Sequence, residues 1–567
     1  MRRSRRLATV TPQPWLESAL TRSTILRVWV GLLFLGVAGW LVIGVRSGVT
    51  VDWTEGMIAP RALYAPTDFS FSHQAQTVTV QRDELIVAKG QRVTASHVAA
   101  LRVLADQAHQ PLRAADAWGL GFLTVLISVA GFLVLRFADP RMGSDARALG
   151  LLGLLILVTL GAAHTLLRAA WPIWGLPMAG MSMALTLLLN PTAAIVATVV
   201  TGLLVGLMAG QQLAVALGLM FGGVAGIVAV RGARKREHLL AAGAWSGAVQ
   251  ALAILAVLIA EHMAWREAFW TAALGGACSG AIAFVLTIAL LPVLEKLFGF
   301  MTNITLLELS DLNHPLLKEL SLKAPGTYHH SLIVATLAEA GCEAIGANGL
   351  LARVGCYFHD IGKMPKADYF VENQPIGHSR HDALSPSMSS LIILNHVKEG
   401  IELAQAHHLN PAIIDFIPGH HGTGLIYYFY RRAIEQVEDE SLLKEESFRY
   451  PGPRPRTRET AVAMLADSSE AACRALPDHS AAKLTGVVRR MINNKFIDGQ
   501  LNDCELTLRD LERIAEAFVR VLTGMYHSRV PYPLPPGEDI EDEELHAGAD
   551  PQSAGGAGAR RPPPTGG

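Results

Sequence analysis

Apolar residues are distributed unevenly along the chain. Residues 25–45 and 118–293 contain long apolar runs with almost no charge, whereas residues 294–530 mix apolar and polar positions as a water-soluble domain does. A helix needs about 20 apolar residues to cross the hydrocarbon core of a bilayer. The pattern therefore predicts an α-helical membrane protein, in which a multi-span bundle precedes a soluble domain. The eight predicted spans are 25–45, 118–137, 149–169, 173–190, 192–209, 211–230, 239–260 and 269–293.

Positive charges orient these spans. Basic clusters precede the first span and follow the second and the sixth, so all of them lie on one side, which the positive-inside rule makes the cytoplasm. The clusters are Arg2, Arg3, Arg5, Arg6, Arg22 and Arg27; Arg136, Arg141 and Arg147; and Arg231, Arg234, Lys235 and Arg236. We therefore expect a cytoplasmic tail at 1–24, a retained anchor at 25–45 in preference to a cleaved signal peptide, a short extracytoplasmic domain at 46–117 and a seven-helix transmembrane domain at 118–293.

The soluble part returns to the cytoplasm after eight crossings. Residues 294–312 predict a connecting helix, and residues 313–530 place apolar residues at helical spacing throughout, which predicts an all-α domain. Residues 531–567 are rich in proline, glycine and acidic residues and predict a disordered tail.

Composition limits the function. The chain is 51% hydrophobic and 17% charged, and its net charge of −1 gives no sign of nucleic acid binding. The five cysteines contain no C-x-x-C pair, and none lies in 46–117. The sequence therefore argues against a disulfide framework and against a cysteine-based zinc site.

Metal-competent side chains recur at the ends or inner faces of five successive apolar helices in the soluble domain. They are His330, His359, Asp360, His396, His420, His421 and Asp467. Any one of them alone would be an ordinary core or surface residue. Several buried histidines and aspartates need partners, because an unpaired buried polar group is costly, and a metal ion could serve them all.

The ligand types limit the metal. Imidazole mixed with carboxylate, without thiolate, favours iron or manganese ahead of zinc. Seven ligands are too many for one catalytic ion that keeps an open position, so we expect two divalent ions bridged by Asp360. Two ions a few ångströms apart are suited to the cleavage of phosphate esters.

The motifs around these residues resemble a known family. His330, His359, Asp360 and Asp467 follow the HD-domain metallohydrolase signature. The segments "APGTYHHSLIVATLAEA", "LLARVGCYFHDIGKMPKADYFVENQ" and "GHHGTGLIYYFY" closely resemble the seven-transmembrane-receptor HD hydrolases, the PgpH-like group. "IAPRALYAPTDF" and "IVAKGQRVTASHVAAL" resemble pieces of its extracellular domain, so the resemblance covers roughly residues 50–530. Residues 46–117 are nevertheless much shorter than that domain usually is.

The resemblance implies a phosphodiesterase that hydrolyses cyclic di-AMP to linear pApA at a two-metal centre. Carried over to this chain, all seven metal ligands are filled, Asp360 is catalytic, and Lys363 helps to hold a phosphate. Tyr328, His329 and Thr423 are weaker candidates around the centre. The mechanism expected is in-line attack of hydroxide on one phosphorus, with the 3′-oxygen leaving.

Other functions remain open at this point. A cyclic di-GMP phosphodiesterase of the HD-GYP type would carry a different signature after the histidine pair, where this chain has "GTGLIYYFY". A mononucleotidase would need only four ligands. A receptor that uses the HD domain mainly to bind nucleotide is compatible with catalysis. A transporter is disfavoured because the spans hold few ionisable residues, with His164 and Arg168 near one span end.

The expected localisation is the bacterial cell membrane, crossed several times, with the HD domain in the cytoplasm. The expected partners are the cyclic dinucleotide, the lipid bilayer and an extracytoplasmic ligand of unknown kind. Homo-oligomers are left open, as are the residues that select adenine over guanine.

Overall fold

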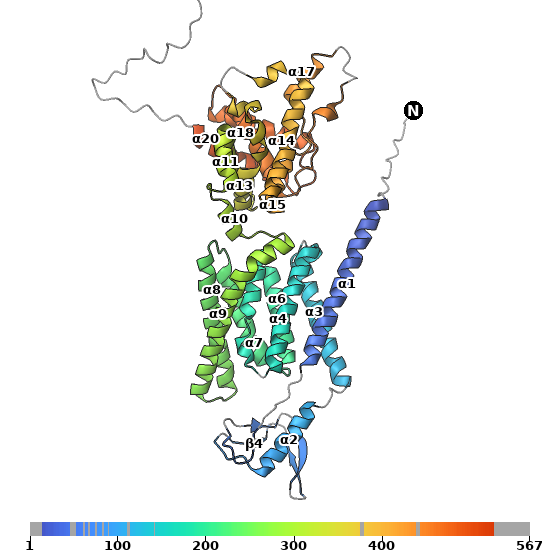
Figure 1. Ribbon diagram of the computed structural model, residues 1–567, viewed down its shortest axis with the longest axis vertical. Helices are drawn as coiled ribbons and strands as arrows, with labels where there is room; N and C mark the ends of the chain where they lie inside the picture. Colours follow the sequence, from blue (N-terminus) through green and yellow to red (C-terminus); the bar gives the residue numbers. More distant parts are fainter. Residues whose placement is uncertain are drawn as a thin grey trace, which may run out of the picture.

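The computed structural model contains a helical bundle with a small mixed domain at one end and a helical domain at the other (Figure 1). It describes residues 14–45, 53–59, 63–65, 68–73, 76–81, 84–88, 90–109, 114–140, 142–169, 171–374, 379–437 and 443–526. Residues 1–13 of the tail predicted at 1–24, and the whole tail predicted at 531–567, lie outside the described residues.

The central bundle has an α-helix at each expected span, although the one at 173–190 covers only part of its span. These helices are α1 (Pro14–Gly44), α3 (Ala114–Ala138), α4 (Ala146–Arg168), α5 (Met178–Leu188), α6 (Pro191–Met208), α7 (Leu213–Val230), α8 (Arg236–Ala260) and α9 (Trp265–Phe298), with short 3-10 turns η1 (Met142–Ser144) and η2 (Ile173–Gly175). Among the residues that the structure describes, six helices are long and apolar enough to cross a membrane: α3, α4, α6, α7, α8 and α9. The chain is therefore a multi-span membrane protein.

The span predicted at 173–190 is not one continuous helix. Its α-helix α5 has 11 residues, too few to cross a bilayer, and the η2 turn precedes it. The carbonyls freed at the break are satisfied from neighbouring helices: Gln250 Nε2 donates to the Trp174 carbonyl at 2.8 Å, and Ser279 Oγ donates to the Leu176 carbonyl at 3.0 Å. Broken backbone inside a bundle is tolerated when side chains replace the lost hydrogen bonds in this way.

Small residues bring α8 and α9 into close contact. Gly243 and Gly247 on α8 face Gly276 and Gly280 on α9, and a methyl group on Gly276 would lie 2.3 Å from the Gly247 carbonyl oxygen. Both helices therefore use glycines four residues apart, the arrangement that lets transmembrane backbones approach each other.

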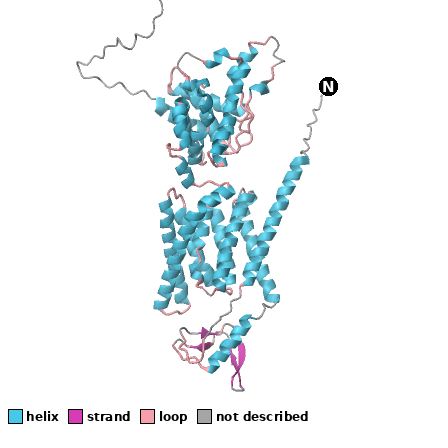
Figure 2. Ribbon diagram, in the orientation of Figure 1, coloured by secondary structure: helices cyan, strands magenta, loops and turns pink. Residues whose placement is uncertain are grey.

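The small domain lies beyond the end of the bundle that is opposite the soluble domain (Figure 1). It consists of two antiparallel pairs, β1 (Leu63–Tyr64) with β4 (Leu85–Val87) and β2 (Phe69–His73) with β3 (Gln76–Val80), and of helix α2 (Ala95–His109). Phe69, Phe71 and Leu104 are buried in its core. Figure 2 shows the strands gathered in this domain.

The connection to the soluble domain differs from the single helix expected at 294–312. Helix α9 continues to Phe298 and ends at Gly299, whose φ of 71° favours glycine, and a separate short helix α10 (Asn303–Leu309) follows. The buried Glu295 carboxylate accepts the Thr302 backbone N–H at 2.8 Å and the Thr305 hydroxyl at 2.7 Å. The N-cap of α10 is Thr302, whose hydroxyl accepts the Thr305 backbone N–H at 3.4 Å, and Glu295 holds this cap in place just after the glycine turn.

The soluble domain is all-helical apart from short 3-10 segments, within the residues described. Its α-helices are α11 (Pro315–Lys323), α12 (Pro325–Ala344), α13 (Gly349–Phe358), α14 (Pro386–Ala406), α15 (Pro411–Ile414), α16 (Phe416–Gly419), α17 (Tyr427–Ile434), α18 (Arg458–Arg474), α19 (Ala481–Ile497) and α20 (Leu508–Tyr526). The 3-10 segments are η3 (Ile361–Tyr369), η4 (Val371–Asn373), η5 (Arg380–Ala383) and η7 (Glu445–Phe448). One hydrophobic core runs through most of these helices.

Candidate metal centre

The seven predicted ligands come from five places in the soluble domain. His330 is on α12, His359 caps α13 with Asp360 next to it, His396 is on α14, His420 and His421 follow α16, and Asp467 is on α18. Gly362 allows the segment that carries His359 and Asp360 to lie directly against α14, which carries His396. A methyl group on Gly362 would lie 1.9 Å from the His396 carbonyl oxygen, so only glycine lets the "HDIGK" turn pack against α14.

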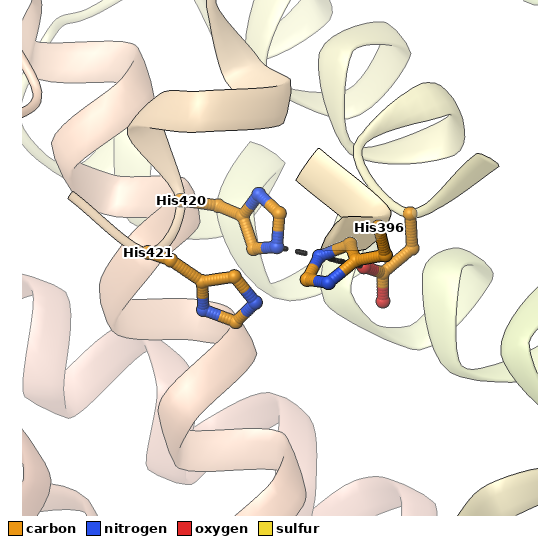
Figure 3. Close-up of side chains that lie close together, drawn as sticks. His396, His420 and His421 are labelled. Carbon is orange, nitrogen blue, oxygen red and sulfur yellow. Dashed lines mark ion pairs between the residues drawn. The ribbon is translucent and has the colours of Figure 1, made fainter. Parts of the chain in front are cut away.

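The structure brings all seven residues together in two groups. One group is Asp360, His396, His420 and His421, and the other is His330, His359, Asp360 and Asp467. Within each group, the possible ligand atoms all lie within 4.8 Å of one another. Figure 3 shows the rings of His396, His420 and His421 around a common space.

Asp360 belongs to both groups, with one carboxylate oxygen for each. Its Oδ1 lies 3.5 Å from His396 Nε2 and 3.5 Å from His420 Nε2. Its Oδ2 lies 3.2 Å from His359 Nε2 and 3.8 Å from His330 Nε2. A carboxylate placed in this way could bridge two metal ions.

Backbone carbonyls and one carboxylate fix the orientation of the imidazole rings. The Nδ1 atoms of His359, His396 and His420 lie 2.7, 2.5 and 3.0 Å from the carbonyl oxygens of Cys356, Ile393 and Phe416. If these Nδ1 atoms carry the proton, each Nε2 keeps its lone pair for the centre, as in metal-binding histidines.

His330 is oriented by a carboxylate instead. Its Nδ1 lies 2.5 Å from Oε2 of Glu470, whose side chain is fully buried, and its Nε2 lies 3.0 Å from Asp467 Oδ1. The sequence-based prediction missed Glu470. The position of Glu470 could have indicated it, because this residue follows Asp467 by three positions on α18 and therefore lies on the same face of the helix.

The centre contains buried polar atoms that need a partner. Among the described residues, His359 Nε2, His396 Nε2, His420 Nε2 and Asp360 Oδ1 are buried and have no hydrogen-bond partner. Four such atoms facing one space would be costly in a protein that bound nothing there. The donor set of imidazole and carboxylate therefore fits a metal centre.

The two groups differ in electrostatics. Burial lowers the pKa of His396 to about 4, and burial with the neighbouring histidines holds the pKa of His421 well below its usual range. Burial also acts to lower the pKa of His330, but hydrogen bonds to Asp467 and Glu470 outweigh it and raise this pKa to about 9. The imidazoles of His396 and His421 are therefore neutral and ready to bind a metal at neutral pH.

Of the remaining candidates, Lys363 contacts the centre directly. Lys363 Nζ pairs with Asp360 Oδ2 at 2.7 Å and with Glu372 Oε1 at 2.9 Å, and these acids raise its pKa although burial acts to lower it. Thr423 is held in the turn after His421. Tyr328 packs against the hydrophobic core, and His329 is exposed on α12, so neither is part of the two groups.

Two family descriptions match the chain. Residues 115–302 match the family described as "7TM receptor with intracellular HD hydrolase", and residues 327–472 match the HD domain. The membrane bundle is therefore similar to the seven-transmembrane receptors with an intracellular HD hydrolase, and the soluble domain is similar to HD domains.

Curated relatives make the similarity more specific. The chain is 38% identical over 361 residues to the cyclic-di-AMP phosphodiesterase PgpH of Listeria monocytogenes, which covers 63% of this chain and 50% of the relative. It is 37% identical over 364 residues to the protein of the same name in Bacillus subtilis, covering 63% of this chain and 51% of the relative. The chain thus spans about half the length of these relatives.

Among solved structures, the HD domain of the Listeria monocytogenes phosphodiesterase PgpH is 46% identical. The match covers 38% of this chain and all of the solved chain, with a TM-score of 0.36. A second structure of that domain, in complex with cyclic di-AMP, is also 46% identical, covers 39% of this chain and all of the solved chain, and has a TM-score of 0.37.

Proposed function

We propose that this chain is a membrane-bound phosphodiesterase that hydrolyses cyclic di-AMP to pApA at its HD centre. The observation that carries the proposal is the placement of Asp360, whose two carboxylate oxygens face two different groups of possible ligands. The substrate is inferred from the two relatives, whose printed names are cyclic-di-AMP phosphodiesterase.

In this proposal, the two groups hold two divalent ions, manganese or iron, with Asp360 shared. Bound there, such ions would activate water and neutralise the charge that develops on the phosphate. Lys363 would hold a non-bridging phosphate oxygen, since its ammonium already lies 2.7 Å from Asp360 Oδ2. The fixed Nε2 atoms keep the ligands in place without reorganisation during the reaction.

Regulation from outside the cell is part of the same proposal. The small domain of residues 46–117 lies at the opposite end of the bundle from the HD domain (Figure 1). An extracytoplasmic ligand bound there could act on the HD domain only through the bundle, in the cell membrane of a bacterium.

The test uses the purified full chain in detergent, loaded with Mn²⁺ or with Fe²⁺ under anaerobic conditions. Cyclic di-AMP and cyclic di-GMP are offered separately, and the products are followed by chromatography. We expect pApA from cyclic di-AMP. Exclusive turnover of cyclic di-GMP would contradict the substrate and favour the alternative phosphodiesterase.

The same assay tests the site. Replacing His359 and Asp360 together with alanine should reduce hydrolysis to background, because both groups lose a ligand. The matched control replaces Glu402 and His407, two exposed residues at the end of α14, with alanine and should keep full activity. Turnover by the first variant at the wild-type rate would show that the site is elsewhere.

A further inference from the structure

Lys495 lies next to the turn that carries two of the proposed ligands. It is near the end of α19, and its side chain is half-buried. A methyl group on Gly424 would lie 3.5 Å from Lys495 Nζ and 3.0 Å from the carbonyl oxygen of His421. The backbone of Gly424 is not in the left-handed region, so its conformation does not require glycine. The absence of a side chain leaves room beside the Lys495 ammonium.

The turn is held by residues outside α19. Gln500 Oε1 accepts the Thr423 backbone N–H at 2.9 Å, and Arg449 NH1 donates to the Thr423 carbonyl at 2.9 Å. The ammonium of Lys495 therefore faces a turn whose position is fixed by its own neighbours.

Lys495 has no partner of opposite charge in direct contact. Asp498, three residues away, is engaged by both terminal nitrogens of Arg449, at 3.1 and 3.2 Å. Asp467 is engaged by His330. In the part of the chain that the structure describes, no hydrogen bond or ion pair joins the Lys495 ammonium, although Asp467 and Asp498 are near enough for their charges to act on it.

The charge of Lys495 is poorly solvated. Burial lowers the pKa of this ammonium, and the charges of Asp467 and Asp498 only oppose that effect. A half-buried cation without a partner is costly, and an incoming anion would relieve the cost.

Lys495 is on the side where the centre opens to solvent. The side chains of Asp360, His396 and His420 are about 1% exposed, whereas Asp467 is 13% exposed and His421 is half-buried. Lys495 lies beside the turn that follows His421 and within electrostatic reach of Asp467. A substrate larger than its reacting phosphate must extend outward on this side.

We propose that Lys495 binds the second phosphate of a cyclic dinucleotide while the first phosphate lies between the two ligand groups. The inference rests on the proposed function and deepens it. A cyclic dinucleotide carries two phosphates in one ring, and the proposed function assigns Lys363, which is paired with Asp360 and Glu372, to the first of them. Lysine suits such a contact because its ammonium binds phosphate as a point charge.

The test replaces Lys495 with methionine in the full chain and measures the kinetics of Mn²⁺-loaded protein on two substrates. Cyclic di-AMP has two phosphates, and bis(4-nitrophenyl) phosphate has one. For cyclic di-AMP we expect KM to rise about tenfold or more, because one charged contact with the substrate is lost, and we expect kcat to stay nearly unchanged. The kinetics on the single-phosphate ester should not change, and Lys495→Arg should keep most of the wild-type KM.

The matched control is Lys483→Met on the same helix. Lys483 is exposed and paired with Asp478 at 2.7 Å, and its Cα is about 18 Å along α19 from that of Lys495. This variant should behave as wild type. In addition, the KM of the wild type for cyclic di-AMP should rise more steeply with salt than the KM of Lys495→Met, which a purely structural role would not produce.

The possible outcomes separate the role of Lys495 from the proposed function of the chain. An unchanged KM for cyclic di-AMP, or an equal loss on both substrates, overturns the role of Lys495 and leaves the proposed function standing. A wild-type protein that cleaves bis(4-nitrophenyl) phosphate but not cyclic di-AMP overturns the proposed function, and the inference with it.

Discussion

At the scale of residues, one buried carboxylate sets the character of the centre. Asp360 is at the end of an apolar helix, and each of its oxygens faces imidazole nitrogens from different elements. Around it, hydrogen bonds from Nδ1 atoms fix three rings through backbone carbonyls and a fourth through Glu470. The centre is therefore prepared by its surroundings before any ligand binds.

Glu470 should tune metal binding without binding metal itself. It orients His330 through Nδ1, and partners of this kind typically change metal affinity 10- to 100-fold when they are replaced. We expect Glu470→Gln to weaken Mn²⁺ binding about tenfold, as measured by calorimetry on the full chain. Because the ligands remain, excess Mn²⁺ should restore hydrolysis.

The control for this prediction is Glu516→Gln, an exposed glutamate on α20, which should leave the Mn²⁺ affinity unchanged. If excess Mn²⁺ failed to restore hydrolysis in Glu470→Gln, the glutamate would have a role beyond orienting His330.

At the scale of elements, glycine decides which helices can touch. The turn after Asp360 reaches α14 only because Gly362 has no side chain, and facing glycines let the backbones of α8 and α9 approach closely. The apolar pattern gives no sign of these approaches, because it marks a face as buried without saying how near the next backbone lies.

Gly276→Ala should loosen the α8–α9 pair. The added methyl would lie 2.3 Å from the Gly247 carbonyl oxygen, a distance that forces the helices apart. We expect a loss of about 1–3 kcal/mol in the free energy of unfolding, measured by SDS-induced unfolding of the purified chain. Gly161→Ala on α4 is the control, since nothing lies within 4 Å of that position. Equal stability of the two variants would contradict close packing at Gly276.

At the scale of the whole molecule, α10 joins the membrane bundle to the HD domain. Ile304 is buried in the core of the bundle, and Leu306, two residues later, is buried in the core of the HD domain. Helix α10 also packs against α13, which ends at His359. A change in the bundle that moved α10 would thus act on an element of the metal centre.

Removing the carboxylate that supports the N-cap of α10 should free this junction. Glu295→Ala takes away the acceptor of the Thr302 N–H and the Thr305 hydroxyl, and leaving these donors unpaired should cost about 1–3 kcal/mol. We expect faster hydrogen exchange in the amides of residues 302–310, measured by mass spectrometry. Lys296→Ala, an exposed neighbour on α9, should leave exchange there unchanged. Unaltered exchange in Glu295→Ala would mean that packing alone holds α10.

The sequence by itself determined the class of the protein. Long apolar runs predict membrane helices because a helix that crosses a bilayer must be apolar over its length. The HD motif indicates which residues could bind metal. The sequence also supplied the seven candidate ligands, which the structure gathers in two groups. These features are local: each depends on a short stretch of chain and on the chemistry of its side chains.

Only the tertiary structure decided the contacts between distant segments. Glu470 lies 140 residues from His330, and Lys495 lies beside a turn about 70 residues earlier. The break before α5 depends on hydrogen bonds from Gln250 and Ser279, which are on other helices. The start of α10 depends on the α9 residue Glu295. Hydrogen bonds between residues that are distant in the chain leave no periodic pattern in the sequence, because they form only when the helices pack together.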